Sequence, residues 1–543
     1  GGGARGDPPP PRPPPAPPNN PALLCPPAAP AVRQKLSFLE RTDARDALRM
    51  IRLPALSPLE HAAFVAAGLL VYVITTRARQ QRRHPYAALA WVLGIAAFPY
   101  LGVPIFLLFG TRKTVRPSTP RQPVPAGPWA ALAPAWATRL LAALGVPEAR
   151  PQAALRFHAD GAQALAELRA LIASAQRTLD VCTYVLGDDE VGAAVAGELA
   201  ARARAGVRVR LLVDSIGSLR SRRSHDALLR AAGVRVRRFM PALRNPRRGR
   251  TNLRNHRKLV VADGLRLWGG GRNLANEYFI GRVGEAPWID LSFSAEGALA
   301  TQAMALFEGD WRIALGLRHA SRIPYAERAM RHEQVLHAYQ PAHASAAALA
   351  ATPPAPANGA APPADAALAQ WVPSGPDFHE DVLHALLISA AFHAQRRLLL
   401  ATPYFVPDEG LIESLLLAAK RGVQVTLLLP RHSNHRLADW ARGRAVRELV
   451  DNGVDVRLLP AMLHAKAVVV DDVLALCGSA NLDSRSLFIN YEAMAAFYSR
   501  AEIDWLAGWI TRTAADGEPA SARPPGLARD VLEGVVGAIA FQL

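Results

Sequence analysis

The sequence predicts a duplicated α/β protein preceded by a hairpin of two transmembrane helices. Two long apolar runs near the N-terminus predict the hairpin. From about residue 150, amphipathic helical segments alternate with short β-branched strands, and the same order recurs after about residue 370. A His-x-Lys motif ends each series, and the two histidines are 208 residues apart, which indicates an internal duplication.

The two apolar runs cover residues 59–76 and 86–109. A helix of about 18 residues is just long enough for a hydrocarbon core of about 30 Å. The second run contains Pro99 and Pro104, which membrane helices tolerate. Buried core helices, or a signal peptide for the first run, are the competing interpretations, but a signal peptide leaves the second run unexplained. Basic residues flank both runs, so the side of the membrane stays open.

We therefore expect six segments. They are a Pro-rich disordered start with a juxtamembrane segment (1–56), the transmembrane helices (57–112), a first α/β half (150–335), an Ala/Pro-rich linker (336–369), a second α/β half (370–512) and a C-terminal tail (513–543).

Composition favours anionic partners. The net charge is +18, which suits a membrane surface, phosphorylated substrates or nucleic acid, although a general bias towards arginine explains part of it. The chain has three widely spaced cysteines, and their spacing indicates neither a disulfide framework nor a zinc site. Only five lysines are present, and two of them follow a histidine by two positions. This pattern indicates that these two positions require an ammonium group and not a guanidinium group.

Both copies of the motif fit H-x-K-x4-D-x6-G. The candidate catalytic residues are His256, Lys258 and Asp263 in the first copy, and His464, Lys466 and Asp471 in the second. Side chains alternate along a strand, so each His shares a face with its Lys while each Asp points the other way. We therefore expect both aspartates to be mainly structural, in hairpin turns. A catalytic role for them is the competing interpretation.

Two histidines in one pocket can divide the work of phosphoryl transfer. One attacks phosphorus as a neutral imidazole, and the other protonates the leaving oxygen. The lysines would neutralise the phosphoryl oxygens, and we expect further phosphate-binding groups at Asn273, Ser479 and Asn481. We expect Asp290 to orient His256 and Glu492 to orient His464, each within its own half. This chemistry needs no metal and no cofactor.

The doubled motif resembles the phospholipase D superfamily. The N-terminal apolar hairpin and the segments "RNHRKLVVADG", "TPYFVPDE", "LHAKAVVVDD" and "GSANLDSRSLFINYE" together resemble the bacterial cardiolipin synthases, over about residues 57–510. The resemblance implies two pseudo-two-fold-related mixed-sheet sandwich halves with one shared active site. It also implies phosphatidyl transfer between two phosphatidylglycerol molecules, through a phosphohistidine for which His256 is the favoured nucleophile. Anionic phospholipids and the bilayer would be the partners, no nucleic acid is expected, and the location would be the bacterial inner membrane as a multi-pass protein.

One departure from the family pattern concerns the segment after each Asp. The second copy reads Gly478-Ser479-Ala480-Asn481, whereas the first has Gly271 at the position of the serine. We expect the first copy to lack one hydroxyl donor to phosphate. A membrane-bound phospholipase D hydrolase is the alternative function, because only the acceptor differs. A nuclease of the same superfamily is a more distant alternative.

Overall fold

A computed structural model describes residue 1 and residues 57–78, 85–110, 129–219, 224–241, 252–316, 324–338, 367–378 and 380–539. The expected disordered start and most of the Ala/Pro-rich linker lie outside these residues. All but the first few described positions belong to one compact unit, Phe64–Leu543.

The N-terminal apolar residues form three helices: α3 (Pro58–Ala78), α4 (Pro85–Ala97) and α5 (Pro99–Phe109). Among the described helices, only the stretch Pro58–Thr76 of α3 is long and apolar enough to cross a membrane. The expected second span is divided, because the chain leaves helical geometry at Phe98, which precedes Pro99. A hairpin of two continuous spanning helices is therefore not confirmed.

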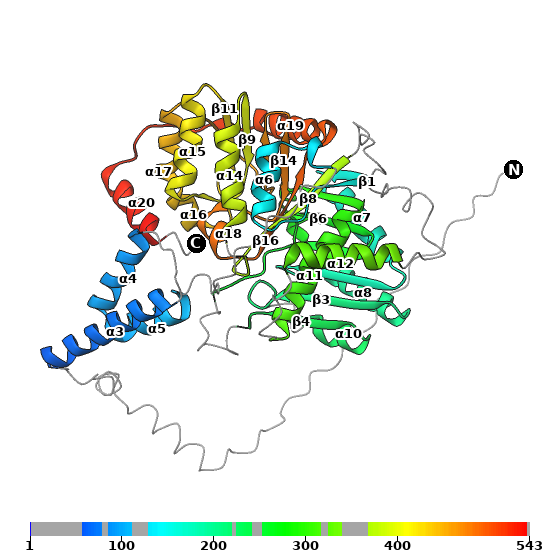
Figure 1. Cartoon of the computed structure of the whole chain (residues 1–543), viewed down its shortest axis with the longest axis horizontal. Helices are drawn as coiled ribbons and strands as arrows, with labels where there is room; N and C mark the ends of the chain where they lie inside the picture. The colour runs from blue at the N-terminus through cyan, green and yellow to red at the C-terminus, as the bar shows by residue number, and fades with distance from the viewer. Residues whose placement is uncertain are drawn as a thin grey trace, which may run out of the picture. The chain divides into compact units, whose positions relative to one another are not determined.

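The sheet has 15 strands in the order β17-β12-β11-β9-β13-β14-β16-β8-β1-β7-β6-β5-β2-β3-β4. Figure 1 labels the two central strands of this order, β8 and β1. The first half contributes β1 (Arg150–His158), β2 (Thr178–Thr183), β3 (Arg208–Asp214), β4 (Arg235–Phe239), β5 (Leu259–Ala262), β6 (Arg266–Gly270) and β7 (Ser292–Gly297). The second half contributes β8 (Ala367–Ser374), β9 (Arg397–Ala401), β11 (Gln424–Pro430), β12 (Asp455–Leu459), β13 (Ala467–Val470), β14 (Leu474–Gly478) and β16 (Glu492–Phe497). β17 (Glu518–Pro519) lies at one edge, and β10 (Phe405–Val406) pairs separately with β15 (Leu482–Asp483).

The strand order shows the duplication directly. Read outward from the centre, the seven strands of one half occur in the same relative order as the seven of the other. Each half contains both parallel and antiparallel strand pairs. β2, β3 and β4 run parallel to one another, as do β9, β11 and β12, and the remaining neighbouring strands are antiparallel. The central strands β1 and β8 pair antiparallel, Arg150 with Ala369. The two halves therefore share one continuous sheet and are not two separate sandwiches.

Helices cover both faces of the sheet. The helices of the first half are α7 (Gly161–Ser174), α8 (Glu190–Arg204), α10 (Asp226–Ala231), η3 (Asn276–Tyr278), α11 (Ala298–Ala314) and α12 (Tyr325–Ala338). Those of the second are α14 (Val382–His393), α15 (Glu409–Lys420), α16 (Arg436–Ala441), α17 (Gly443–Asp451), α18 (Ser484–Phe488), α19 (Arg500–Ala515) and α20 (Leu527–Ile539). η1 (Ala130–Leu132) and α6 (Ala135–Ala143) precede the first half, and α6 packs against α14 of the second half.

Strand β5 shows how this layering follows from the sequence. Its run "LVVA" is fully buried, as expected for a strand covered on both sides. Leu259 and Val261 pack in the core cluster that contains α11 residues, while Val260 and Ala262 pack with α7 and α8. The alternation of side chains places these two clusters on opposite faces of the sheet. The catalytic motif thus enters the sheet at a rigid, doubly covered strand.

Candidate active site

The two His-Lys pairs lie in the segments that lead into β5 and β13. His256 and Lys258 precede β5, which begins at Leu259, and His464 and Lys466 precede β13, which begins at Ala467. The expected His-bearing strand therefore begins one residue after each lysine. Both segments are held by backbone bonds to the opposite half, at the bridges Asn255–Tyr491 and Ile289–Leu463. The two motif segments are thereby tied together across the pseudo-two-fold axis.

His256 is positioned by a carboxylate from the second half. Its backbone N–H donates to the carbonyl of Tyr491 (2.9 Å), and its Nδ1 lies 3.0 Å from Glu492 Oε1. Because a carboxylate accepts the Nδ1 proton, Nε2 keeps its lone pair. Burial lowers the pKa of His256, with Glu492 opposing that effect and Lys258 adding to it. The imidazole is thus held neutral, with a nucleophilic nitrogen available.

His464 has the equivalent arrangement with a carboxylate from the first half. Its backbone N–H donates to Ile289 (2.7 Å), and its Nδ1 lies 2.6 Å from Asp290 Oδ2. Burial and the adjacent Lys466 lower the pKa of His464 to about 3. Burial would raise the pKa of Asp290, but His464 and Lys466 bring it down to about 2. Asp290 is therefore a stable carboxylate.

The expected pairing of each histidine with an acid of its own half is wrong. The pairs are His256 with Glu492 and His464 with Asp290. The backbone explains the exchange, because Tyr491 bonds both to Arg254 and to His256, which places the next residue, Glu492, beside the imidazole. The Ile289 bridge does the same for Asp290 and His464. Spacing along the chain carries no information about such cross-half contacts.

The two lysines bring buried positive charge to the same place. Burial lowers the pKa of Lys258 to about 7 and that of Lys466 to about 8. Lys258 Nζ donates to the His256 carbonyl (2.7 Å), and Lys466 Nζ lies 2.8 Å from His464 Nδ1. Each lysine also lowers the pKa of the histidine from the other half. Such mutual influence is a property of one shared site. It also favours an anionic ligand, which would stabilise the ammonium forms.

Asp263 and Asp471 point away from this site. Each has a positive φ, 55° and 49°, in the turn that follows its strand. The Asp263 carboxylate accepts the backbone N–H groups of Gln176, Arg177 and Thr178, at 2.7–3.0 Å for the best contact of each. Asp471 does the same for residues 395–397 at 2.8–2.9 Å. Both carboxylates therefore hold the start of a neighbouring strand, as strand parity predicts.

The three residues expected to bind phosphate have other contacts. The Ser479 hydroxyl donates to Glu492 Oε2 (2.5 Å), so its single proton supports the carboxylate that orients His256. The Asn273 amide donates to the Tyr278 hydroxyl (2.8 Å), which leaves one amide hydrogen for another acceptor. Within the described part of the chain, buried Asn481 Oδ1 has no hydrogen-bond partner. Ser479 is thus better described as a positioning residue than as a phosphate donor.

The serine-to-glycine difference between the copies has a steric cause. A Cβ atom on Gly271 would lie 2.2 Å from Asp290 Oδ1. Asp290 occupies the space that a serine side chain would need, whereas the equivalent Ser479 packs against Glu492. The first copy therefore lacks the hydroxyl because Asp290 fills the space beside Gly271 and leaves no room for a serine side chain.

Several residues of the site were not anticipated. The Tyr184 ring meets the His256 ring edge to face, with centroids 5.1 Å apart, and Tyr278 does the same to His464 at 5.0 Å. Buried Arg257 donates to Asp310 (2.6 Å) and to the Glu492 carbonyl (3.0 Å), which anchors the motif segment from below. Asp310 lies in the segment "LFEGDW" (306–311), and nothing in that segment indicates Arg257 as its partner.

A duplicated α/β unit with a His-Lys pair from each half at one buried site defines a two-histidine enzyme acting on phosphodiesters. The family model described as "Cardiolipin synthase, PLD-like domain" matches residues 168–311 and 387–513, and the model "Phospholipase_D-nuclease N-terminal" matches residues 64–110. The chain is 31% identical over 454 residues to cardiolipin synthase A of Klebsiella pneumoniae, covering 78% of this chain and 85% of that one. It is 30% identical over 459 residues to cardiolipin synthase A of Serratia proteamaculans, with the same coverage.

The crystal structure of phosphatidylserine synthase from Haemophilus influenzae superimposes with a TM-score of 0.53 at 15% identity, over 75% of this chain and all of that chain, which is a likeness of fold. The chain belongs to the cardiolipin synthase family of the phospholipase D superfamily. It is a phosphatidyltransferase of the phospholipase D type.

Proposed function

We propose that the protein transfers a phosphatidyl group from one phosphatidylglycerol molecule to a second, giving cardiolipin and glycerol, at the site formed by His256, Lys258, His464 and Lys466. The observation that carries this proposal is the crossed pairing of His256 with Glu492 and of His464 with Asp290. It gives one site two imidazoles, each held in the tautomer with an unprotonated Nε2; that of His464 lies 3.0 Å from Lys466 Nζ.

In the first step, Nε2 of one histidine attacks the phosphorus of the donor lipid. A P–N bond forms, and the P–O bond to the headgroup glycerol breaks. The other histidine gives its proton to the departing glycerol oxygen. Both imidazoles are neutral in the free site. Binding of the phosphodiester anion raises the pKa of the acid, which takes up a proton from solvent at Nε2 before the transfer begins.

In the second step, a headgroup hydroxyl of the acceptor phosphatidylglycerol attacks the phosphohistidine. The neutral second histidine takes the hydroxyl proton, the new P–O bond forms and the P–N bond breaks. Water in place of the lipid would give phosphatidic acid. The lysines act in both steps, since their charge lies where the equatorial oxygens gain negative charge in the transition state.

We assign the nucleophile to His256. Its side chain is 12% exposed, whereas that of His464 is 3% exposed, so a lipid phosphate reaches the His256 ring more readily. Its partner Glu492 is supported by the Ser479 hydroxyl, which stabilises a positive imidazole when the P–N bond forms. His464, enclosed by Asp290 and Lys466, is left to handle the proton of the glycerol oxygen.

The membrane attachment is part of this proposal. We assign the anchor to α3 together with the apolar segment α4–α5, which is supported by the family match over residues 64–110. The substrates are then anionic phospholipids of the bacterial inner membrane, and the enzyme is multi-pass. The bounds of the two halves (150–335 and 370–512), the linker (336–369) and the tail (513–543) remain predictions from the sequence.

The test is to incubate membranes containing the protein with phosphatidylglycerol labelled in its headgroup. We expect cardiolipin and free labelled glycerol. Phosphatidic acid as the sole lipid product would instead identify a hydrolase. Protein denatured rapidly at alkaline pH, at which a P–N bond survives, and then digested for mass spectrometry should carry the phosphatidyl group on the peptide with His256. A label on the His464 peptide would reverse the two roles.

A further inference from the structure

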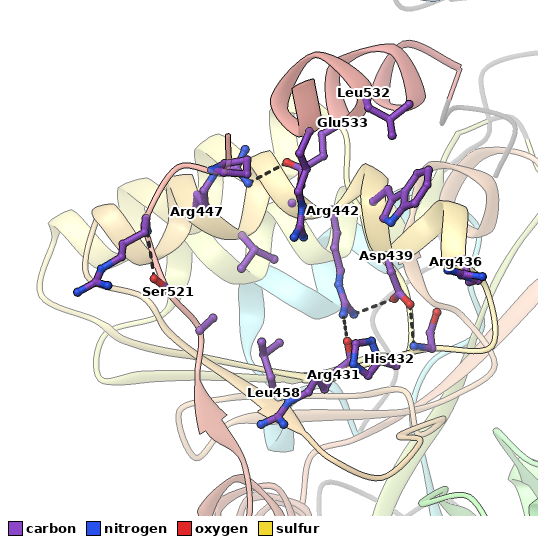
Figure 2. A pocket seen from close by; sticks show the side chains of 18 residues that line it. Arg431, His432, Arg436, Asp439, Arg442, Arg447, Leu458, Ser521, Leu532 and Glu533 are labelled. Atoms are coloured by element: carbon purple, nitrogen blue, oxygen red, sulfur yellow. Dashed lines mark hydrogen bonds and ion pairs between the residues drawn. The ribbon is translucent and has the colours of Figure 1, made fainter. Parts of the chain in front are cut away.

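A second cavity, separate from the His-Lys site, lies between the C-terminal helix α20 and helices α16 and α17 (Figure 2). Its volume is about 930 Å³. The residues from 520 onward that close it lie beyond the last residue of the family match, residue 513. The cavity is thus partly made by a segment that the family model does not describe.

The lining of this cavity is strongly basic. It contains six arginines and only two carboxylates, Asp439 and Glu533. Glu533 is already engaged by Arg447 of α17 (2.8 Å), a contact that also fixes α20 to α17 (Figure 2), and by Arg529 of its own helix (3.0 Å). Asp439 accepts the backbone N–H of Ser433 (2.8 Å). Both carboxylates thus have local contacts, although Asp439 Oδ1 makes no hydrogen bond among the described residues and has only Arg442 Nη1, 3.3 Å away, as an ion-pair partner.

Three arginines of the lining keep unused donors. Among the described residues, Arg436 and Arg523 have no ion pair. Arg442 is only 6% exposed, and its Nη1 makes no hydrogen bond within that part of the chain, although it lies 3.3 Å from Asp439 Oδ1. Figure 2 shows its side chain directed between Asp439 and the Arg431 carbonyl, which accepts from Nη2 (2.8 Å). A buried guanidinium N–H without an acceptor is costly, and a phosphate oxygen would satisfy it.

An apolar surface adjoins these cations. Helix α20 exposes Leu527 (82%), Val531 (55%) and Val535 (58%), which are spaced four residues apart and so share one face. Leu532 of the same helix lines the cavity itself, together with Trp440 of α16. The opposite face of α20 carries Asp530 and Glu533, which pair with α17. Arginines beside a stripe of exposed aliphatic side chains match a molecule with an anionic head and hydrocarbon tails.

We propose that this cavity binds the phosphodiester headgroup of an anionic phospholipid, with the acyl chains lying along the exposed face of α20. Arg436, Arg442 and Arg523 bind the phosphate oxygens, and Leu527, Val531 and Val535 contact the chains. The site is an accessory lipid site, distinct from the His-Lys site and independent of turnover. It lies next to the catalytic framework, because α16 packs on β10, whose partner β15 directly follows Asn481.

The test uses the full-length protein in phosphatidylcholine nanodiscs containing a phosphatidylglycerol analogue with a photoreactive acyl chain. Irradiation and peptide mapping should place the label on α20. In the double variant Arg436→Gln/Arg523→Gln, we expect labelling of α20 to fall roughly thirtyfold, since each contact of a basic residue with an anionic headgroup contributes about 1 kcal/mol. Labelling near His256 should persist. The matched control, Arg235→Gln/Arg237→Gln, removes two exposed arginines of β4 and should leave both labels unchanged.

Two further measurements separate the possible ligands. A photoreactive phosphatidylcholine should label α20 weakly, whereas equal labelling would show that headgroup charge is irrelevant and would overturn the proposal. Leu527→Gln/Val531→Gln should also lower labelling by the anionic lipid. If it does not, and inorganic phosphate alone displaces the label, the cavity is a site for free phosphate and the proposal fails. Neither result depends on whether cardiolipin is formed, so the catalytic proposal is tested separately.

Discussion

His256 Nδ1 lies 3.0 Å from Glu492 Oε1, although the two residues are 236 positions apart and belong to opposite halves of the chain. The equivalent contact joins His464 to Asp290, 174 positions apart and in the reverse direction. Each half therefore provides a histidine for its own motif and an acid for the other. Neither half contains a complete catalytic pair, so the active site exists only when both halves pack on the shared sheet.

The crossed acids are expected to control different steps. Glu492→Gln removes the acceptor that fixes His256, and the maximal rate should fall roughly a hundredfold or more, as when the acid behind a catalytic histidine is neutralised. Labelling of His256 should slow in proportion. Asp290→Asn should slow both labelling of His256 with the natural donor, since that step releases glycerol, and attack by the acceptor; with a phosphatidyl donor that carries a p-nitrophenol leaving group, which needs no proton, labelling of His256 should recover. Glu296→Gln, in β7, is the control and should change neither step. Identical defects in both variants would argue against separate roles.

The Gly271 position should reject the serine found in the second copy. Because a Cβ there would lie 2.2 Å from Asp290 Oδ1, Gly271→Ser should displace Asp290 and lower the turnover rate at least tenfold, with the melting temperature also reduced. Gly197→Ser, in α8, is the matched control, since a Cβ at Gly197 meets no atom within 4 Å. A rise in the turnover rate of Gly271→Ser would mean that the added serine hydroxyl donates to the substrate phosphate, and that the first copy lacks this donor.

Ser479 should matter through Glu492. Ser479→Ala removes the hydroxyl that donates to the Glu492 carboxylate, which we expect to lower the turnover rate about tenfold while leaving KM for phosphatidylglycerol nearly unchanged. In a Glu492→Gln background, Ser479→Ala should lower the turnover rate much less, because the two residues act as one unit. If Ser479→Ala raised KM alone, the hydroxyl would instead bind the substrate phosphate.

The aspartates of the motif should affect stability more than chemistry. In Asp471→Asn, the carboxylate that accepts three backbone N–H groups becomes an amide with one acceptor oxygen, and the free energy of unfolding should fall by about 1–2 kcal/mol. Turnover per folded molecule should stay within a few-fold of the parent. Asp516→Asn, at an exposed turn, is the control for both measurements. A large loss of turnover with unchanged stability would restore the catalytic interpretation.

The lowered pKa values of Lys258 and Lys466 predict opposite effects of rising pH, which should weaken substrate binding and increase stability. Lys258 and Lys466 have pKa values of about 7 and 8, so the free site loses positive charge as the pH rises through this range. Inhibition by inorganic phosphate and kcat/KM should therefore weaken above about pH 8. The unfolded chain still binds these protons up to about pH 10, so stability should rise with pH between 7 and 10.

Two measurements check the pH prediction. Measuring the phosphate inhibition constant at several pH values tests the predicted effect on binding. Chemical denaturation at several pH values tests the predicted effect on stability. Lys420→Met, which removes a lysine of α15 outside the site, should leave both profiles unchanged. Phosphate inhibition that is constant from pH 6 to 9 would contradict the assigned charge changes.

The sequence by itself determined the elements that depend on local pattern. The repeated H-x-K-x4-D spacing, the alternation of helices and strands and the turn chemistry of "ADG" and "VDD" are local, and from them follow the duplication, the family and the structural role of Asp263 and Asp471. The turn pattern was sufficient for the last of these, because a hairpin turn involves only neighbouring residues.

Only the tertiary structure decided which groups meet. The backbone bridges Asn255–Tyr491 and Ile289–Leu463 exchange the acids between the halves, and β1 and β8 merge two expected sandwiches into one sheet. The contact of Ser479 with Glu492 and the clash at Gly271 are likewise properties of packing. These contacts join residues far apart in the chain, and their free energy depends on distances that are set only after both halves have folded, so no spacing in the sequence encodes them.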